Sequence, residues 1–205
     1  MRQTEYWTEA CRVLSRNDAV MKRLIKRYPL ATLHSRGNAF ETLLRAIVGQ
    51  QISVKAADAV WGRLCTFTSI KAETVRNLSA DQIKSCGLSR MKAEYCLDLA
   101  GHFAEGRIRP RRWSHLADEA IIDELTDVRG IGRWTAEMFL IFHLLRPNVW
   151  PVDDLGLLKA LSLHYANGER ITPSRAWEMG ELWQPWRTVA TWYLWRSLDP
   201  VPVEY

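Results

Sequence analysis

The spacing of apolar residues along the chain predicts a protein built almost entirely of helices. In residues 39–64, apolar side chains from Phe40 to Val48 recur at three- and four-residue intervals, which is typical of one face of a helix. Gly49 and the polar and β-branched residues after it predict a break, and Ser53 stands where it can cap the second piece. No segment alternates apolar and polar residues convincingly, so we expect no substantial sheet.

Further helices are expected on both sides of this segment. Residues 4–27 read as one basic amphipathic helix whose cations gather near its C-terminal end, where they suit the helix dipole. Ser79 and Gln82 have the spacing of a capping box. The basic segment 106–113 is expected to be a solvated loop. The other predicted helices span 90–104, 118–126, a stretch from about 133, and 155–163.

The composition is that of an ordinary soluble globular protein, with 47% hydrophobic and 25% charged residues. The formal net charge of +5 permits a polyanionic partner without requiring one. No apolar run approaches the roughly 18–20 residues that span a bilayer, and the first ten residues lack the pattern of a secretory signal. We therefore expect a cytoplasmic protein without membrane contact. The ten tryptophans fit either core packing or the stacking of bases.

The cysteines and histidines give no sign of a metal site. Cys11, Cys65, Cys86 and Cys96 contain no CxxC pair, and we expect them to be buried as small apolar side chains. Their spacing also excludes a local four-cysteine iron–sulfur loop. The five histidines show no paired ligand spacing. No side-chain metal site is therefore expected.

A short turn between two helices is the most informative stretch. Gly130 and Gly132 separate the helix that ends near Asp127 from an apolar helix that begins at about Arg133. Glycines let a backbone approach a ligand closely, and the amides at a helix start are unpaired and carry partial positive charge. Such a turn can hold a phosphate, and the hydroxyl of Thr135 can add a contact. A tight helix–helix turn explains the same pattern equally well.

Two carboxylates, Asp153 and Asp154, precede the apolar helix that begins at Leu155. An aspartate there is a routine helix N-cap, with a contribution of about 1 kcal/mol. Taken alone, the residues favour the cap over a catalytic role.

Four segments, taken together, resemble the helix-hairpin-helix DNA glycosylase superfamily. LTDVRGIGRWTA (125–136) resembles its hairpin, and WPVDDLGLLKAL (150–161) resembles its Gly/Pro-rich loop and aspartate. GQQISVKAA (49–57) and GLSRMKAEY (87–95) resemble two further motifs, in the expected order. The resemblance covers about residues 38–200. It is strongest to the DNA-3-methyladenine glycosylase II branch, in a compact form without the N-terminal β-domain.

The resemblance implies an all-α fold of two helical lobes with a cleft between them. Residues 38–146 would form the hairpin lobe, and residues 1–37 together with 147–205 would form the lobe with the catalytic aspartate. Asp154 matches that aspartate, and Asp153 then lies outside the chemistry. The implied reaction is hydrolysis of the N-glycosidic bond of alkylated purines flipped out of duplex DNA. The product is an abasic site.

The resemblance also assigns residues to the pocket. Trp134 stands where bifunctional relatives carry a lysine nucleophile, so no Schiff base and no lyase step are expected. Its π-face can instead stack on a cationic base. Trp195 matches a second aromatic residue of the pocket. Met138 and Leu155 stand where the best-studied branch has tyrosines, which implies a less aromatic pocket.

Further roles concern DNA and a cation. Gln51, or alternatively Ile52, matches the side chain that fills the gap left by the flipped base; Gln51 could equally tie the backbone at the helix break. The carbonyls of Thr126, Val128 and Gly130 match a monovalent cation site for Na⁺ or K⁺. No other cofactor is expected, and nothing points to an oligomer.

Two alternatives remain open. One is a glycosylase of the same superfamily for another lesion, against which Trp134 and the missing cysteine cluster argue. The other is a non-catalytic helix-hairpin-helix module that only binds DNA, against which Asp154 argues.

Overall fold

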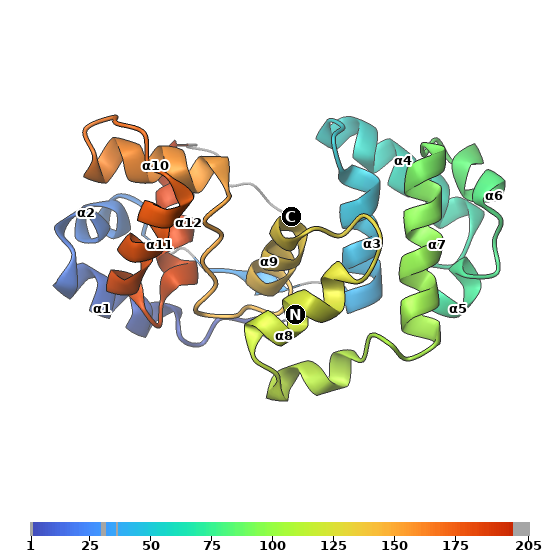
Figure 1. Cartoon of the computed structure of the whole chain (residues 1–205), viewed down its shortest axis with the longest axis horizontal. Coiled ribbons are helices and arrows are strands. Elements are labelled where there is room, and N and C mark those ends of the chain that lie inside the picture. Colours follow the sequence, from blue (N-terminus) through green and yellow to red (C-terminus); the bar gives the residue numbers. More distant parts are fainter. Residues whose placement is uncertain (1, 30–31, 36, 199–205) are drawn as a thin grey trace. The chain divides into compact units, whose positions relative to one another are not determined.

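The computed structural model describes residues 2–29, 32–35 and 37–198. Helices dominate it, as predicted (Figure 1). The one sheet in these residues is an antiparallel pair of two-residue strands, β1 (Arg2–Gln3) and β2 (His34–Ser35). The all-α class expected from the sequence is therefore confirmed.

The chain forms two compact units. We call Gly37–Phe139 the central unit, and Met1–Arg36 together with Leu140–Tyr205 the terminal unit. The chain passes from one to the other inside helix α9 (Arg133–Phe142). The sequence analysis placed this transition seven residues later, after 146. Phe142 belongs to the terminal unit, where its ring stacks on Trp195.

The central unit is built around α7 (Arg90–Ala104), which packs against α3 (Ala39–Gly49), α5 (Ala72–Val75) and α6 (Ala80–Ser85) (Figure 1). Along α7, Ala93, Cys96, Leu99 and Ala100 are fully buried. The helices of this unit are α3 (Ala39–Gly49), α4 (Val54–Phe67), α5 (Ala72–Val75), α6 (Ala80–Ser85), α7, the 3₁₀ helix η1 (Pro110–His115), α8 (Asp118–Thr126) and most of α9.

Side-chain caps mark the starts of four of these helices, α3, α4, α6 and α7. Ser53 accepts a hydrogen bond from the amide of Ala56 at the start of α4. Ser79 and Gln82 form the predicted capping box at the start of α6. Each cap satisfies backbone amides that the helix itself leaves unpaired. The predicted break after Gly49 and the predicted bounds of α7 and α8 are confirmed.

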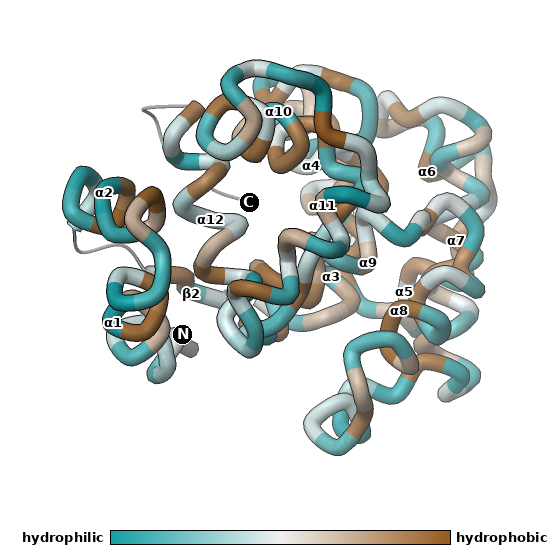
Figure 2. Tube along the Cα trace, turned by 60° about the vertical axis from the view of Figure 1, so that its left-hand side comes forward, coloured by the Kyte–Doolittle hydropathy of each residue, from teal (hydrophilic) through white to brown (hydrophobic). Residues whose placement is uncertain are grey.

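In the terminal unit, α12 (Arg187–Leu198) packs against α1, α2 and α10. Val189, Ala190 and Leu194 on α12 are fully buried. Figure 2 shows that apolar and polar residues are mixed along the helices of the chain, as expected of helices with one buried face. The other helices of the unit are α1 (Trp7–Asn17), α2 (Ala19–Arg27), α10 (Leu155–Tyr165), α11 (Pro173–Gly180) and the 3₁₀ helix η2 (Glu181–Trp183).

The prediction of a single helix over 4–27 is wrong. The backbone is extended at Asp18, whose carboxylate accepts hydrogen bonds from the amides of Val20 and Met21 and so starts α2. The same carboxylate accepts from the Tyr165 hydroxyl and the Trp183 indole. An aspartate with several donors is stabilised outside a helix, so the continuous apolar pattern does not decide the structure here.

Two smaller expectations need correction. Cys86 and Cys96 are buried as predicted, but Cys11 is half-buried and Cys65 is exposed. Part of the basic segment 106–113 belongs to η1 rather than to a loop, because Trp113 is buried. Among the residues described, no helix combines the length and apolar character needed to cross a membrane.

Candidate functional site

The hairpin between α8 and α9 is a compact turn. The amide of Val128 donates to the carbonyl of Leu125 (3.2 Å), and the amide of Ile131 donates to the carbonyl of Val128 (3.1 Å). Gly130 has a φ of +86°, in the left-handed region that side chains other than glycine rarely adopt. Its carbonyl accepts a hydrogen bond from Gln50 Nε2 at 2.8 Å.

The two glycines of the hairpin have different surroundings. A Cβ on Gly130 would overlap the ring of Tyr95 and lie only 2.5 Å from its Cγ. A Cβ on Gly132 would meet no atom within 4 Å, and Gly132 is exposed. The first turn of α9 follows immediately, and the first amides of a helix have no partner within the helix itself. Gly130 therefore serves packing within the chain, whereas Gly132 leaves bare backbone beside a helix start.

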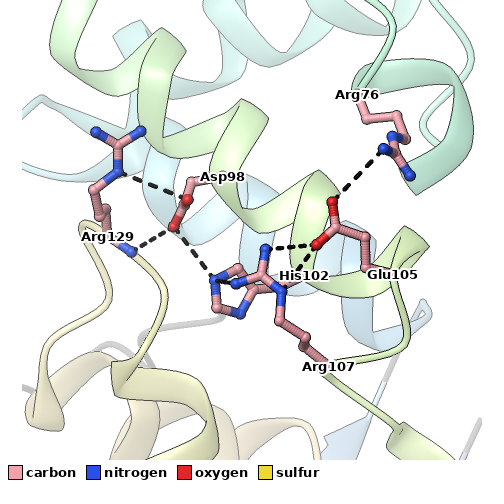
Figure 3. Close-up of polar contacts among 6 residues, drawn as sticks. All are labelled: Arg76, Asp98, His102, Glu105, Arg107 and Arg129. Carbon is pink, nitrogen blue, oxygen red and sulfur yellow. Dashed lines mark hydrogen bonds and ion pairs between the residues drawn. The ribbon is translucent and has the colours of Figure 1, made fainter.

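Asp98 on α7 anchors the hairpin from behind. Its Oδ2 accepts a hydrogen bond from the backbone amide of Arg129 at 2.9 Å, and its Oδ1 lies 3.7 Å from Arg129 Nε (Figure 3). The carboxylate thus satisfies a backbone group of the turn and pairs with its side chain. The position of the hairpin is coupled to a helix whose core residues are fully buried.

Asp98 also lies close to the buried side chain of His102. His102 Nε2 lies 3.7 Å from Asp98 Oδ2, and Arg107 Nη1 donates to the same nitrogen at 2.6 Å (Figure 3). Because a guanidinium has no lone pair to offer, Nε2 accepts and the imidazole is neutral, with its proton on Nδ1. Burial, followed by the charge of Arg107, lowers the pKa of His102. Arg107 also pairs with Glu105 at 3.0 Å.

The loop after α3 is tied to the same structure. The Lys92 ammonium donates to the carbonyls of Val48 (2.9 Å) and Gln50 (2.5 Å), and burial lowers its pKa. Gln51 is exposed with a φ of +57°, and Ile52 is 42% exposed. Gln50 is thus the side chain that connects this loop to the hairpin. Gln51 and Ile52, the two residues predicted to fill the gap left by a flipped base, are exposed on the same loop.

Two of the three carbonyls expected to hold a cation already accept hydrogen bonds. Val128 O accepts from the amide of Ile131, and Gly130 O accepts from Gln50. A carbonyl oxygen has two lone pairs, so both groups, together with Thr126 at the end of α8, still fit a monovalent cation. Within the described part of the chain, no three His, Cys, Asp or Glu side chains gather as they would around a metal ion.

The start of α9 carries the predicted pocket residues of the central unit. Trp134 is 43% exposed, Met138 is buried one turn further along, and Thr135 is half-buried. Arg133 pairs with Glu119 at 2.6 Å and with the buried Glu137 at 3.1 Å. These carboxylates offset a cation at a helix start, where its charge is unfavourable.

Asp154 is the N-cap of α10, as its position in the sequence indicates. Its Oδ1 accepts a hydrogen bond from the amide of Leu157 at 2.7 Å and a second from the indole nitrogen of Trp195, also at 2.7 Å. Asp154 is half-buried, whereas the neighbouring Asp153 is exposed. Leu155 is 82% exposed. The two aspartates therefore differ in burial, and Asp154 is held by donors from two helices.

The segment before Asp154 is held by hydrogen bonds to other parts of the terminal unit. The Thr188 hydroxyl donates to the carbonyl of Arg146 (2.6 Å) and accepts from the amide of Val149 (3.0 Å). The Trp150 indole donates to the carbonyl of Ala176 at 2.9 Å. A polar loop fixed in this way gives the carboxylate a defined position.

The structure thus brings together some of the predicted site residues. In the terminal unit, Trp195 contacts Asp154, and Leu155 is adjacent in sequence. In the central unit, the hairpin glycines, Thr135, Trp134 and Met138 lie on one turn and the helix after it. The loop with Gln51 and Ile52 is connected to that turn by the hydrogen bond from Gln50 to Gly130.

Sequence reasoning did not identify the residues that support these groups: Gln50, Lys92, Tyr95 and Asp98. A signal existed for three of them. Lys92, Tyr95 and Asp98 follow one another at three-residue intervals, which places them on one side of α7. Each of the three contacts a backbone atom or a glycine of a distant turn, which no side-chain pattern reveals.

The chain is similar to known base excision repair proteins. The model of the HhH-GPD superfamily base excision DNA repair protein matches residues 44–187. The DNA-3-methyladenine glycosylase 1 of Schizosaccharomyces pombe is 33% identical over 195 residues, covering 90% of this chain and 84% of that protein. A DNA-3-methyladenine glycosidase structure from Bacillus halodurans aligns with a TM-score of 0.87 at 32% identity, covering 96% of this chain and 92% of that one. The Schizosaccharomyces pombe 3-methyladenine DNA glycosylase in complex with abasic DNA aligns with a TM-score of 0.76 at 31% identity, covering 92% and 96%.

Proposed function

We propose that this chain, which belongs to the HhH-GPD superfamily of base excision DNA repair proteins, is a DNA glycosylase that releases alkylated purines from duplex DNA. The observation that carries the proposal is the Asp154 carboxylate, held at 2.7 Å by both the Leu157 amide and the Trp195 indole. The relatives named for 3-methyladenine support the substrate class.

The carboxylate supplies the chemistry. Breaking an N-glycosidic bond builds positive charge on the sugar, as in other glycoside hydrolyses. A carboxylate fixed by two donors stabilises that charge without having to reorganise, and it can orient or deprotonate the attacking water. A purine alkylated at N3 or N7 already carries positive charge and leaves readily. The reaction therefore needs little help from a general acid.

The central unit binds the DNA backbone and supplies the side chain that replaces the flipped base in the helix. The exposed backbone at Gly132 and the first amides of α9, with the hydroxyl of Thr135, bind a phosphate without reading the sequence. Gln51 or Ile52, both exposed on the loop held by Lys92, fills the space of the flipped base. The face of Trp134, 43% exposed, stacks on the cationic base.

The reaction ends at an abasic site. Trp134 occupies the position at which the resemblance gives bifunctional relatives a lysine, so the chain has no amine there for a Schiff base. A borohydride trapping assay tests this step. We expect no covalent complex with DNA, and strand breaks only after alkali treatment. A trapped complex would contradict the monofunctional assignment.

The proposal also includes a bound monovalent cation and a monomeric protein. The carbonyls of Thr126, Val128 and Gly130 would hold a Na⁺ or K⁺ ion, which would add positive charge beside the phosphate-binding backbone. The protein acts as a monomer on double-stranded DNA, with no other cofactor. Sedimentation at micromolar concentration checks the monomer.

The decisive experiment compares wild-type protein with Asp154→Asn and the matched neighbour Asp153→Asn. The measurement is release of 3-methyladenine and 7-methylguanine from methylated duplex DNA. We expect Asp154→Asn to lower the rate by roughly 10²- to 10⁴-fold, and Asp153→Asn to leave it within about threefold. DNA binding by both variants is the control for folding. Absence of release by wild-type protein would overturn the proposal, and release by wild type with an unaffected Asp154→Asn would remove the role of Asp154 alone.

A further inference from the structure

The indole of Trp195 and the glycine at 156 meet at the Asp154 carboxylate. We propose that Trp195 is a positioning residue for this carboxylate, and that Gly156 is present because a side chain there would crowd the contact. The inference rests on the proposed role of Asp154 and adds two residues that act through it. Under this proposal, Trp195 acts through the indole nitrogen at the edge of its ring, and this role is distinct from stacking the face of the ring on a base.

The two donors on Oδ1 constrain the carboxylate in different ways. The Leu157 amide belongs to the first turn of the helix that Asp154 caps, so it holds the oxygen close to that helix. Trp195 Nε1 approaches from α12, 41 residues away in sequence, and donates to the same oxygen at 2.7 Å. A carboxylate held by one donor can rotate about its side-chain bonds. A second donor from another helix selects one orientation.

Trp195 is itself held in place. Its ring stacks on Phe142, with a centroid distance of 6.0 Å and an interplanar angle of 14°. One face of the indole is therefore covered by a side chain of the same unit, while its edge points to Asp154. A donor whose ring packs against a neighbouring ring has a more defined position, and its hydrogen bond passes that constraint on to the acceptor.

Gly156 lies against both partners. A Cβ there would be 3.1 Å from Asp154 Oδ1, 3.2 Å from Trp195 Cδ1 and 3.4 Å from Trp195 Nε1. Gly156 is the second residue of α10, where alanine would ordinarily favour the helix more than glycine does. The glycine thus opposes helix propensity at a point where a methyl group would press on both partners of the hydrogen bond.

Positioning and stacking predict different kinetics. A base-stacking role makes the loss on substitution depend on the charge of the lesion. A positioning role slows bond cleavage equally for every lesion and disappears when Asp154 no longer supplies a carboxylate. Single-turnover excision rates at saturating enzyme, measured beside DNA dissociation constants, separate the two.

The experiment uses Trp195→Phe, which removes the donor and keeps an aromatic ring, and Gly156→Ala, which keeps the donor and displaces it. Each is made in the wild-type chain and in the Asp154→Asn background. We expect each to lower the single-turnover rate by roughly ten- to a hundredfold, the effect of losing a hydrogen bond to a charged group. The rate loss should be equal for 3-methyladenine and 7-methylguanine, with DNA affinity within about twofold. In the Asp154→Asn background neither substitution should slow the residual reaction further.

Matched controls exist in the chain. Trp183→Phe also removes an indole donor to an aspartate, Asp18, in the same unit, and Gly62→Ala adds a methyl group to a helix with no atom within 4 Å. We expect Trp183→Phe to lower thermal stability and neither control to lower the single-turnover rate of folded protein.

The outcomes separate the two levels of the argument. Absence of release by wild-type protein overturns the proposed function and, with it, this inference. If wild type is active and Asp154→Asn is not, full rates for both Trp195→Phe and Gly156→Ala overturn this inference alone. A lesion-dependent loss in Trp195→Phe with an unaffected Gly156→Ala also overturns it, in favour of base stacking.

Discussion

The hairpin of the central unit and the Asp154 segment of the terminal unit are both turns that lead into a helix, yet they present different groups. At the hairpin, backbone is exposed around Gly132, while Tyr95 and Asp98 support the turn from behind. At α10, the functional group is a side-chain carboxylate, and the backbone amide of Leu157 serves as its support. Backbone and side chain exchange roles between the two turns.

Because the two turns present different groups, substitutions in them should affect different steps. Backbone amides bind any phosphate, so a displaced hairpin weakens binding to all DNA sequences alike. A displaced carboxylate leaves binding intact and slows bond cleavage. Two measurements, the DNA dissociation constant and the single-turnover rate, should therefore respond separately to changes in the two turns.

The largest effect on stability is expected from Gly130→Ala. The new methyl group would overlap the Tyr95 ring, and the residue would keep a φ of +86°. Overpacking and left-handed strain together predict a loss of about 2–4 kcal/mol in the free energy of unfolding. Urea unfolding checks this value, with Gly132→Ala as the matched control, because it meets no atom of the chain and should cost well under 1 kcal/mol beyond helix effects. Equal losses in the two variants would contradict the difference described between these glycines.

The next effect is expected from Asp98→Ala. It leaves the backbone amide of Arg129 without its acceptor, which predicts a loss of about 1–3 kcal/mol in stability and weaker binding to duplex DNA. The single-turnover rate at saturating enzyme should stay within about threefold of wild type. Asp98→Asn keeps an acceptor oxygen and should recover most of the affinity. A slowed rate with unchanged affinity would show that the hairpin does more than bind.

Lys92→Met should have a smaller effect. The variant keeps the apolar stem but loses the donors to the carbonyls of Val48 and Gln50, which predicts a loss of about 1 kcal/mol in stability. Because the same contacts hold the loop with Gln51 and Ile52, base flipping should weaken as well. A fluorescent adenine analogue opposite the lesion measures flipping, and Lys84→Met, at an exposed position on α6, is the control. Unchanged flipping in a destabilised Lys92→Met variant would limit Lys92 to a structural role.

The smallest effect concerns pH. Burial and Arg107 lower the pKa of His102 below the value of about 6.5 that it has in an unfolded chain. Below pH 6.5 the unfolded chain therefore binds a proton that the folded protein does not, and stability falls as the pH drops. His102→Gln, which keeps an acceptor for Arg107, should flatten this fall in stability between pH 7 and 5. Identical slopes in the two proteins would remove His102 as the cause.

Local rules predicted much of the fold. The starts of α6 and α7 follow from the capping side chains Ser79 and Ser89, and the predicted bounds of α7 and α8 match the structure. The same rules failed at Asp18, where the apolar period continues through a break. Its carboxylate has partners at 165 and 183, and contacts at that separation leave no mark in a local pattern.

In the candidate site, too, features set by nearby residues could be predicted and features set by distant contacts could not. Asp154 could be predicted as a helix cap, and the resemblance marked it as a catalytic residue, but its contact with Trp195 joins residues 41 apart. Gln50 and Gln51 are identical neighbours with different roles: one bridges to Gly130, and the other takes a φ of +57° and is exposed. Residue type alone cannot separate them, because the difference lies in the backbone.

The open space around Gly132 has a consequence for how tolerant the gene should be to mutation. A library screened for protein abundance in cells should retain small residues at 132, since no atom of the chain opposes them, while it should lose nearly every substitution at 130. A library screened for survival of an alkylating agent should lose both. Any intolerance confined to the second screen originates outside the chain, in the nucleic acid that the bare backbone meets.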